Sequence, residues 1–91
     1  MVHMKLTAKQ RALSDKIDEI LWLEWDPIGV NDVEDARDEY SSYVNKLYSL
    51  KMQGADRQTI AAALFEIETK WMCLIGDMEH CNKIAGRIIE L

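Results

Sequence analysis

The sequence predicts an all-α protein whose four amphipathic helices pack as an antiparallel four-helix bundle. Three observations support this fold class. Apolar residues recur at helical spacing in four segments, short stretches of turn-forming residues separate these segments, and no useful length of sequence alternates as a strand would. We treat residues 1–91 as a single helical domain, because 91 residues suit one domain, and we expect residues 1–6 to form a flexible tail.

The first helix is expected at about residues 8–24. Thr7 and Gln10 have the spacing of a capping box, in which each side chain hydrogen-bonds the backbone N–H of the other residue. One face of the helix then carries apolar residues at i, i+4, i+7 and i+8: Leu13, Ile17, Ile20 and Leu21. Pro27 ends the helix, because a proline disfavours helical backbone in the residue before it, and Asp26 is therefore expected to be extended.

The segment Trp-Asp-Pro-Ile-Gly-Val, residues 25–30, is expected to form a structural turn between the first two helices. Trp25, Asp26, Pro27 and Gly29 define it. Gly29 can adopt a positive φ at little cost, which suits a reversal of the chain. We interpret the segment as a packed interhelical loop rather than a ligand-binding loop, because a phosphate-binding loop would contain more glycines and a neighbouring cation.

The second helix is expected to begin at Asn31 or Asp32 as its N-cap and to run to about Gln53, with Gly54 as a left-handed C-terminal residue. Its apolar and aromatic residues cover a wide arc: Tyr40, Tyr43, Val44, Leu47, Tyr48 and Leu50. A wide apolar arc indicates packing against more than one neighbour. We interpret the tyrosines as core residues rather than as a surface on which a ligand stacks.

The third and fourth helices are expected to begin after Asp56 and Asp77, which are the N-cap residues. The third helix has an inner face of Ile60, Ala63, Leu64, Ile67 and Trp71, and Phe65 and Met72 form a strip on its flank. After a break at residues 73–76, the fourth helix has an inner face of Cys81, Ile84, Ala85, Ile88 and Ile89, joined by Met78.

Charge and composition exclude several classes of function. The net charge is −5 and the pI is about 4.9, which argues against a nucleic-acid partner, because phosphate binding requires clustered Lys and Arg. No apolar run approaches the roughly 20 residues of a membrane span, and no signal-peptide pattern is present, so a cytoplasmic location is the default expectation. Cys73 and Cys81 are expected to be reduced core residues, and too few ligands accompany them for a metal site. No cofactor is predicted.

Two residues of the first helix do not fit its pattern. Trp22 lies on the polar face, opposite the apolar stripe, so either another segment such as the N-terminal tail or a partner must cover it. Glu24 falls inside the apolar stripe. A carboxylate facing the core must be hydrogen-bonded, and we expect Glu24 to accept bonds from backbone N–H groups of the turn or from a tyrosine hydroxyl. A role as general acid or base is the alternative, but no second catalytic group accompanies it, and we predict no catalytic residues.

An acidic run follows the turn. Six acids and one base, Arg37, lie between residues 26 and 40: Asp26, Asp32, Glu34, Asp35, Asp38 and Glu39. The helix dipole explains acids in a first helical turn, but Asp38 and Glu39 lie beyond that turn. The run is interpreted either as a solvated helix face or as a docking surface for a basic partner. Calcium is a weaker alternative, because the EF-hand spacing is absent. The candidate partner-binding residues are Trp22, Asp26, Asp35, Asp38 and Glu39.

Three groups of residues resemble a family of small bacterial helical proteins of unknown function. They are Trp25-Asp26-Pro27-Ile28-Gly29-Val30, then Asp38-Glu39-Tyr40 with Tyr43, and finally Ile67-Glu68 with Met72. The resemblance spans roughly residues 17–90, and the Trp-Asp-Pro-Ile-Gly segment is its most specific part. Similar proteins often have Gly and Pro where this chain has Cys73 and Ile75, so the third loop is expected to differ in shape. The resemblance implies a bacterial cytosolic protein and supplies no catalytic residues.

The sequence therefore favours a non-enzymatic protein-binding domain. Its most concrete form is an immunity or antitoxin-like protein that neutralises a basic toxin through an acidic surface, since opposite charges accelerate association. Two alternatives remain open. One is a small enzyme or ligand-binding protein that uses Glu24 and the tyrosines in a pocket between the first two helices. The other is a homodimeric regulatory or adaptor protein that associates through Trp22 or the strip of Phe65 and Met72.

Overall fold

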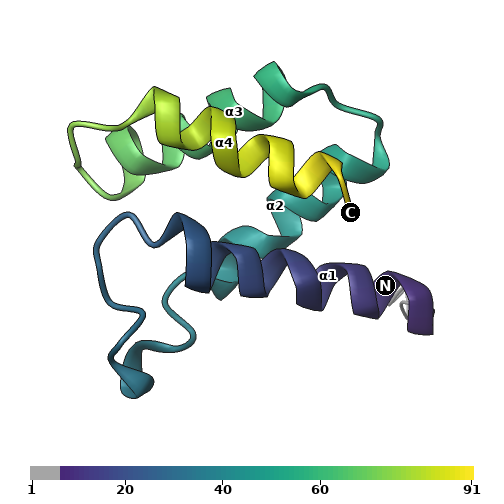
Figure 1. The fold of residues 1–91 in the computed structure, drawn as a ribbon, viewed down its shortest axis with the longest axis horizontal. Helices are drawn as coiled ribbons and strands as arrows, with labels where there is room; N and C mark the ends of the chain where they lie inside the picture. Colours follow the sequence, from purple (N-terminus) through teal and green to yellow (C-terminus); the bar gives the residue numbers. More distant parts are fainter. Residues whose placement is uncertain (1–6) are drawn as a thin grey trace, which may run out of the picture.

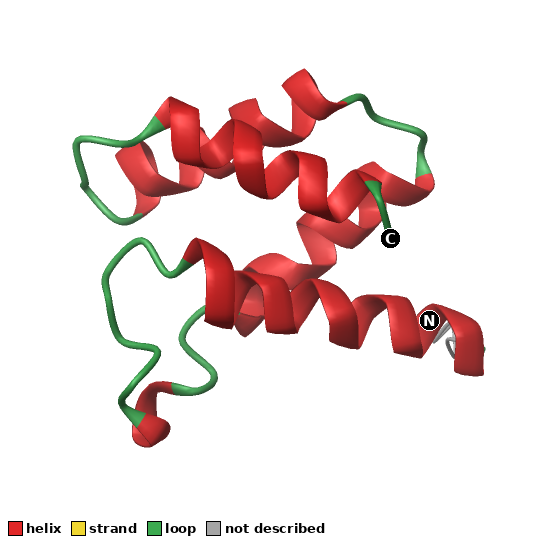
Figure 2. Cartoon of the chain, in the orientation of Figure 1, coloured by secondary structure: helices red, strands yellow, loops and turns green. Residues whose placement is uncertain are grey.

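A computed structural model of the chain describes residues 7–91, and every regular element in this part of the chain is a helix (Figures 1 and 2). Four helices pack together, so the all-α fold class is confirmed. The expected N-terminal tail, residues 1–6, lies outside the described residues. None of the described helices has the length and apolar composition needed to cross a membrane.

The first helix forms as predicted, but its last turn is wider than an α-helical turn. Helix α1 spans Ala8–Ile20 and continues directly into the π-helix η1, Leu21–Trp25. The capping box is confirmed: Thr7 Oγ1 accepts from the Gln10 N–H at 3.1 Å, and Gln10 Oε1 accepts from the Thr7 N–H at 2.8 Å. At the end of η1, the Asp26 N–H donates to the Leu21 carbonyl, five residues back, at 3.0 Å. A π-type turn holds one more residue than an α-type turn, so it rotates the residues that follow it.

The turn after η1 differs in one residue from its prediction. Gly29 has φ +67°, so the positive φ is confirmed. Asp26, expected to be extended, instead has a left-handed backbone with φ 33° and ψ 60°. The prediction was wrong because it used only the proline that follows. Aspartate tolerates the left-handed region better than most residues, and the Asp26 carboxylate hydrogen-bonds the turn that this conformation closes.

The second helix begins about ten residues later than predicted. Residues 31–40 form turns around a short 3₁₀-helix, η2, Glu34–Ala36, and helix α2 spans Ser41–Met52. Neither Asn31 nor Asp32 is therefore a helix N-cap. In an α-helix the acidic pairs Glu34–Asp38 and Asp35–Glu39 would lie at i, i+4, where like charges repel. The observed backbone hydrogen bonds instead connect an N–H to the carbonyl three residues back, as from the Ala36 N–H to the Val33 carbonyl at 2.9 Å.

The second half of the chain follows its predicted boundaries closely. Helix α3 spans Arg57–Glu66, the π-helix η3 spans Ile67–Trp71, and helix α4 spans Met78–Ile89. Asp56 and Asp77 cap α3 and α4 as predicted, because their carboxylates accept from the Thr59 and His80 N–H groups at 2.8 and 3.1 Å. Gly54 follows α2 with φ +78°, which confirms its left-handed conformation.

The helices bury one continuous core. Helix α3 packs along α4, and α1 packs against α2 and also reaches α4, as Figure 1 shows. Aromatic side chains contribute heavily at the end of the molecule where η1 meets α2. The buried hydrophobic residues are Ile17, Ile20, Leu21, Trp22, Trp25, Tyr40, Val44, Leu47, Ile60, Ala61, Ala63, Leu64, Ile67, Cys81, Ile84, Ala85 and Ile88.

Four residues expected in the core are exposed instead. Trp71 and Cys73 lie on the surface, as do Met78 and Ile89 at the two ends of α4. For Trp71 the reason is η3, in which the Met72 N–H donates to the Ile67 carbonyl at 2.9 Å. The wider turn rotates Trp71 outward. Cys81 is buried as predicted.

Candidate functional site

The turn after η1 is held by one carboxylate. Asp26 accepts from the Val30 N–H at 2.8 Å and from the Asn31 N–H at 3.3 Å, and the Tyr40 hydroxyl donates to it at 2.7 Å. The same hydroxyl accepts from the Ile28 N–H at 3.3 Å. Burial and the neighbouring Asp26 carboxylate raise the pKa of Tyr40 above its usual value, because both disfavour the phenolate. These bonds fix the turn as a structural unit.

A second carboxylate joins this turn to the loop before α4. Glu68 is 2% exposed, and it accepts from Trp25 Nε1 at 2.8 Å and from the Asp77 N–H at 2.9 Å. The Trp25 carbonyl oxygen lies 3.0 Å from His80 Nε2, which must be the donor because a carbonyl only accepts. Burial, with Glu68 nearby, raises the pKa of the Cys81 thiol to about 12. Glu68 therefore holds two distant parts of the chain together.

A cleft of about 430 Å³ opens beside these bonds, between the turn and the loop. Its lining residues are Trp25, Asp26, Pro27, Glu68, Leu74, Gly76, Asp77 and His80. The polar side chains among them already make the hydrogen bonds described above or cap α4. Folding alone explains why these groups converge.

Trp22 is buried, with 7% of its surface exposed, so of the two predicted covers the chain itself supplies one, and the assignment of Trp22 to a partner-binding surface was wrong. Its ring lies 6.2 Å from the ring of Tyr40, and the Arg37 guanidinium lies 5.2 Å above its centroid. Arg37 is held there by an ion pair with Asp18 at 3.0 Å. Both of these neighbours, Arg37 and Tyr40, belong to residues 31–40, so no partner is needed to explain the burial. Trp22 offers little surface to a partner.

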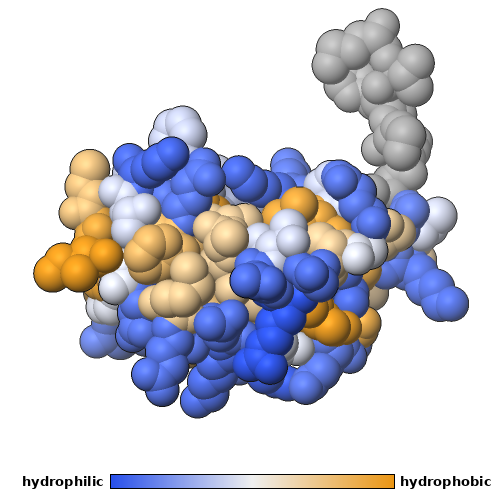
Figure 3. Space-filling model, turned by 90° about the horizontal axis from the view of Figure 1, so that it is seen from above, coloured by the Kyte–Doolittle hydropathy of each residue, from blue (hydrophilic) through white to orange (hydrophobic). Residues whose placement is uncertain are grey.

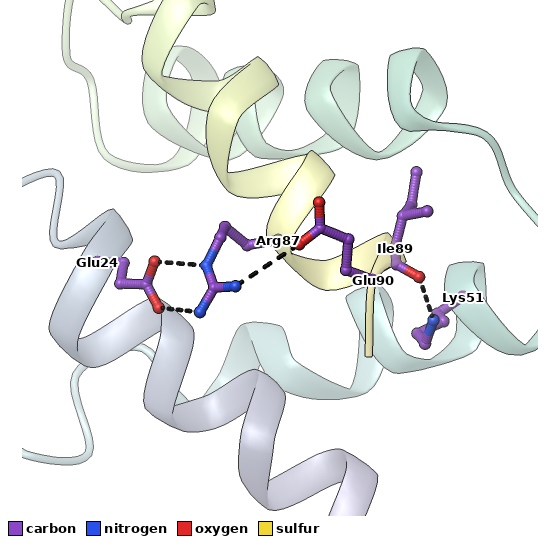
Figure 4. A network of polar contacts seen from close by, with 5 residues as sticks. All are labelled: Glu24, Lys51, Arg87, Ile89 and Glu90. Atoms are coloured by element: carbon purple, nitrogen blue, oxygen red, sulfur yellow. Dashed lines mark hydrogen bonds and ion pairs between the residues drawn. The ribbon is translucent and has the colours of Figure 1, made fainter.

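Glu24 is exposed, so its assignment as a buried polar residue was also wrong. Its carboxylate pairs with both Nε and Nη2 of Arg87, at 3.0 and 3.3 Å, and Figure 4 shows this pair bridging η1 and α4. Beside it, Arg87 approaches Glu90 at 3.7 Å, and Lys51 Nζ donates to the Ile89 carbonyl at 3.0 Å. The π-helical turn places Trp25, rather than Glu24, on the inner face.

The acidic segment, defined here as residues 32–39, forms an exposed surface. Asp35, Asp38 and Glu39 are exposed, as are Asp32 and Glu34, and none of these five carboxylates forms an ion pair within residues 7–91. The single base of the segment, Arg37, is paired with Asp18, so its charge is largely compensated from outside the segment. Asp26 differs from the others, because its carboxylate is used inside the turn.

The described part of the chain holds no cluster of three or more His, Cys, Asp or Glu side chains arranged to bind a metal ion. Compared with known proteins, the chain matches no family model, no curated protein and no solved structure. The resemblance of its Trp-Asp-Pro-Ile-Gly segment to a bacterial helical family stays a prediction.

Sequence reasoning missed Glu68 and the exposed loop that contains Ile75. A signal for Glu68 was present: it lies four and eight residues after Leu64 and Ile60, at the spacing of the buried face. For the loop, the apolar composition of residues 71–78 was a usable signal, since a surface loop of that length normally carries more polar residues.

Proposed function

We propose that this chain is a non-enzymatic, cytoplasmic protein-binding domain that associates with a basic protein through the acidic segment. In its most concrete form it is an immunity or antitoxin-like protein that neutralises a basic toxin. We also retain the antiparallel four-helix bundle as the proposed arrangement of the helices. The observation that carries the functional proposal is the group of five exposed carboxylates without an ion-pair partner in the described chain.

The start of α2 strengthens this proposal. Acids in the first turn of a long helix are explained by the helix dipole. Here α2 begins at Ser41 and has no acid in its first turn, and the acids lie instead around a 3₁₀-helix of three residues. The local structure therefore supplies little compensation for their mutual repulsion. A cationic partner would compensate this repulsion, and the negative field of the acidic segment would accelerate the partner's approach.

Two alternatives have lost the observation that motivated them. The enzyme or ligand-binding alternative rested on a buried Glu24, and the homodimer alternative rested in part on an uncovered Trp22. Glu24 is exposed in an ion pair, and Trp22 is covered by the chain itself.

The test compares two pairs of neutralising substitutions that change the net charge equally. The double variant Asp38→Asn/Glu39→Gln alters the acidic segment, and Glu66→Gln/Glu90→Gln alters exposed acids on α3 and after α4. Association with a basic protein isolated from the native host is measured by stopped flow at two salt concentrations. The first variant should associate more slowly and show a weaker salt dependence, and the second should behave like the wild type. Equal rates in both variants would contradict the proposal.

A further inference from the structure

The loop between η3 and α4, together with the last residue of η3 and the first residue of α4, exposes apolar side chains at the surface. We call residues 71–78 the apolar loop. Trp71 is 69% exposed, Ile75 is 97% exposed and Met78 is 41% exposed. Figure 3 shows hydrophobic residues gathered at the end of the molecule where Figure 1 places this loop. Folding gains nothing from an isoleucine side chain that remains in water, so the packing of this chain does not explain the loop.

The exposure of the apolar loop is fixed by its backbone. The Leu74 N–H donates to the Glu68 carbonyl at 2.8 Å. Gly76 has φ +89°, and a Cβ atom there would lie 2.6 Å from Phe65 Cε2 and 2.8 Å from Thr69 Cγ2. Only glycine fits this close approach. The loop is therefore held against α3 with Trp71 and Ile75 exposed, and a pre-organised surface loses less entropy on binding than a loose one.

The apolar loop and the turn that leads into the acidic segment lie at the same end of the molecule. Asp26 lines one side of the cleft described above, and Leu74 and Asp77 line the other. The hydrogen bond between His80 and the Trp25 carbonyl holds the two sides together. Figure 1 places the acidic segment and the apolar loop toward this end of the molecule, on either side of the turn, so a partner that spans the turn can contact both.

Charge identifies the occupant of this surface. A second copy docked through a two-fold axis would bring two acidic segments toward each other, in a chain whose net charge is already −5. The cytoplasmic face of a membrane is also negatively charged and would repel the segment. A cationic protein that presents an apolar depression satisfies both surfaces.

We propose that the apolar loop, with Trp71 and Ile75, anchors the basic partner whose approach the acidic segment accelerates. This inference rests on the proposed function and adds the chemistry of the partner: a basic surface next to an apolar depression. Tryptophan is enriched among the residues that dominate binding energy, and such anchors act mainly on dissociation. The acidic segment acts mainly on association.

The first experiment needs no partner. Trp22 and Trp25 are buried, so acrylamide should quench the emission of Trp71 preferentially, and Trp71→Phe should remove the accessible component. Analytical ultracentrifugation of the wild type should give a monomer. A monomer in which Trp71 is protected from acrylamide would overturn the proposal. Self-association that Trp71→Ser abolishes would also overturn it, because a second copy would then be the occupant.

The second experiment uses a basic protein isolated from the native host with the wild-type chain as bait. Trp71→Ser and Ile75→Ser should each accelerate dissociation, on the order of thirtyfold for Trp71, with little change in association rate. Met52→Ser is the matched control, because Met52 is 54% exposed beside Leu13 and Leu91, away from the cleft. Binding of the wild type should also protect Trp71 from acrylamide.

The outcomes separate the inference from the proposed function. If Asp38→Asn/Glu39→Gln slows association while Trp71→Ser and Ile75→Ser dissociate like the wild type, the anchor is overturned and the proposed function stands. If Trp71→Ser and Ile75→Ser accelerate dissociation but Asp38→Asn/Glu39→Gln leaves the association rate unchanged, the loop binds a partner whose approach the acidic segment does not accelerate. The proposal then fails as stated. A wild-type chain that retains no basic protein contradicts both.

Discussion

The indole Nε1 of Trp25 donates a hydrogen bond of 2.8 Å to Glu68 Oε2, and each residue lies in one of the two π-helices found within residues 7–91. The bond connects residues 43 positions apart in the sequence. This bond fixes the end of η1 against η3. The other oxygen of the Glu68 carboxylate accepts from the Asp77 N–H and so also fixes the loop before α4. The turn that leads into the acidic segment is thus held against the apolar loop by a buried contact.

Replacing Glu68 should therefore destabilise the fold. Glu68→Leu leaves the buried Trp25 donor unpaired, at a cost of about 1–3 kcal/mol, and it also removes the part-buried bond from the Asp77 N–H. Glu68→Gln should lie between Glu68→Leu and the wild type, because its single amide oxygen can accept only some of these bonds. Urea denaturation followed by circular dichroism measures the free energy of unfolding. Glu66→Gln, at an exposed position at the end of α3 just before η3, is the control and should have little effect. A Glu68→Leu protein as stable as this control would contradict the role of the carboxylate.

Gly29 should tolerate only residues that accept a positive φ. Gly29→Val should lower the free energy of unfolding by about 1–3 kcal/mol through backbone strain, since φ is +67°. Nothing lies within 4 Å of a Cβ atom built there, so crowding is not the cause. Gly29→Asn should lose less, because asparagine enters the left-handed region more readily. Thermal denaturation of both variants distinguishes strain from packing, and equal losses would argue against strain.

The tryptophans should separate into core and surface residues. Trp22→Ala should destabilise the chain by about 3–5 kcal/mol, as large-to-small substitutions in a core do. Trp71→Ala should change stability by less than about 0.5 kcal/mol, because the side chain is 69% exposed. Chemical denaturation of the two variants under the same conditions makes the comparison. The reverse order would show that the described burial of these residues is wrong.

The two thiols should react at very different rates. Cys73 is exposed and Cys81 is buried, so a thiol reagent at mildly alkaline pH should label one cysteine quickly and the other only after unfolding. The raised pKa of Cys81 means that the folded state favours the neutral thiol. This contribution to stability is complete below the thiol's ordinary pKa of 9.0 and is lost as the pH rises toward about 12. Cys81→Ala should therefore lose less stability than the wild type as the pH rises above 9.0. Rapid labelling of both thiols in the folded wild type would contradict the predicted difference in reactivity.

The ion pair of Glu24 and Arg87 should contribute little. Both side chains are partly exposed, so solvent and salt screen their attraction. A double-mutant cycle with Glu24→Gln and Arg87→Gln should give a small coupling that falls as salt is added. A large, salt-independent coupling would indicate that the pair is shielded from water.

Much of the fold follows from the sequence because local signals specify it. The capping box at Thr7 and the N-caps at Asp56 and Asp77 depend on neighbouring residues alone, as does the left-handed conformation of Gly54. The candidate site was less predictable. Asp35, Asp38 and Glu39 are exposed as a docking surface requires, but their segment was placed in a helix that begins only at Ser41.

The sequence by itself determined the helical class, the caps and the charge of this protein, because each arises from local composition and spacing. Tertiary structure alone decided which face of each helix turned inward after residues 21 and 67, where the π-helices begin. The extra residue in the η1 turn places Trp25, rather than Glu24, in the core. The extra residue in the η3 turn places Glu68 in the core and leaves Trp71 exposed to water. A regular period of 3.6 residues cannot reveal this shift. The wider turns coincide with the buried bond between Trp25 and Glu68, a contact that exists only once the two halves of the chain have packed together.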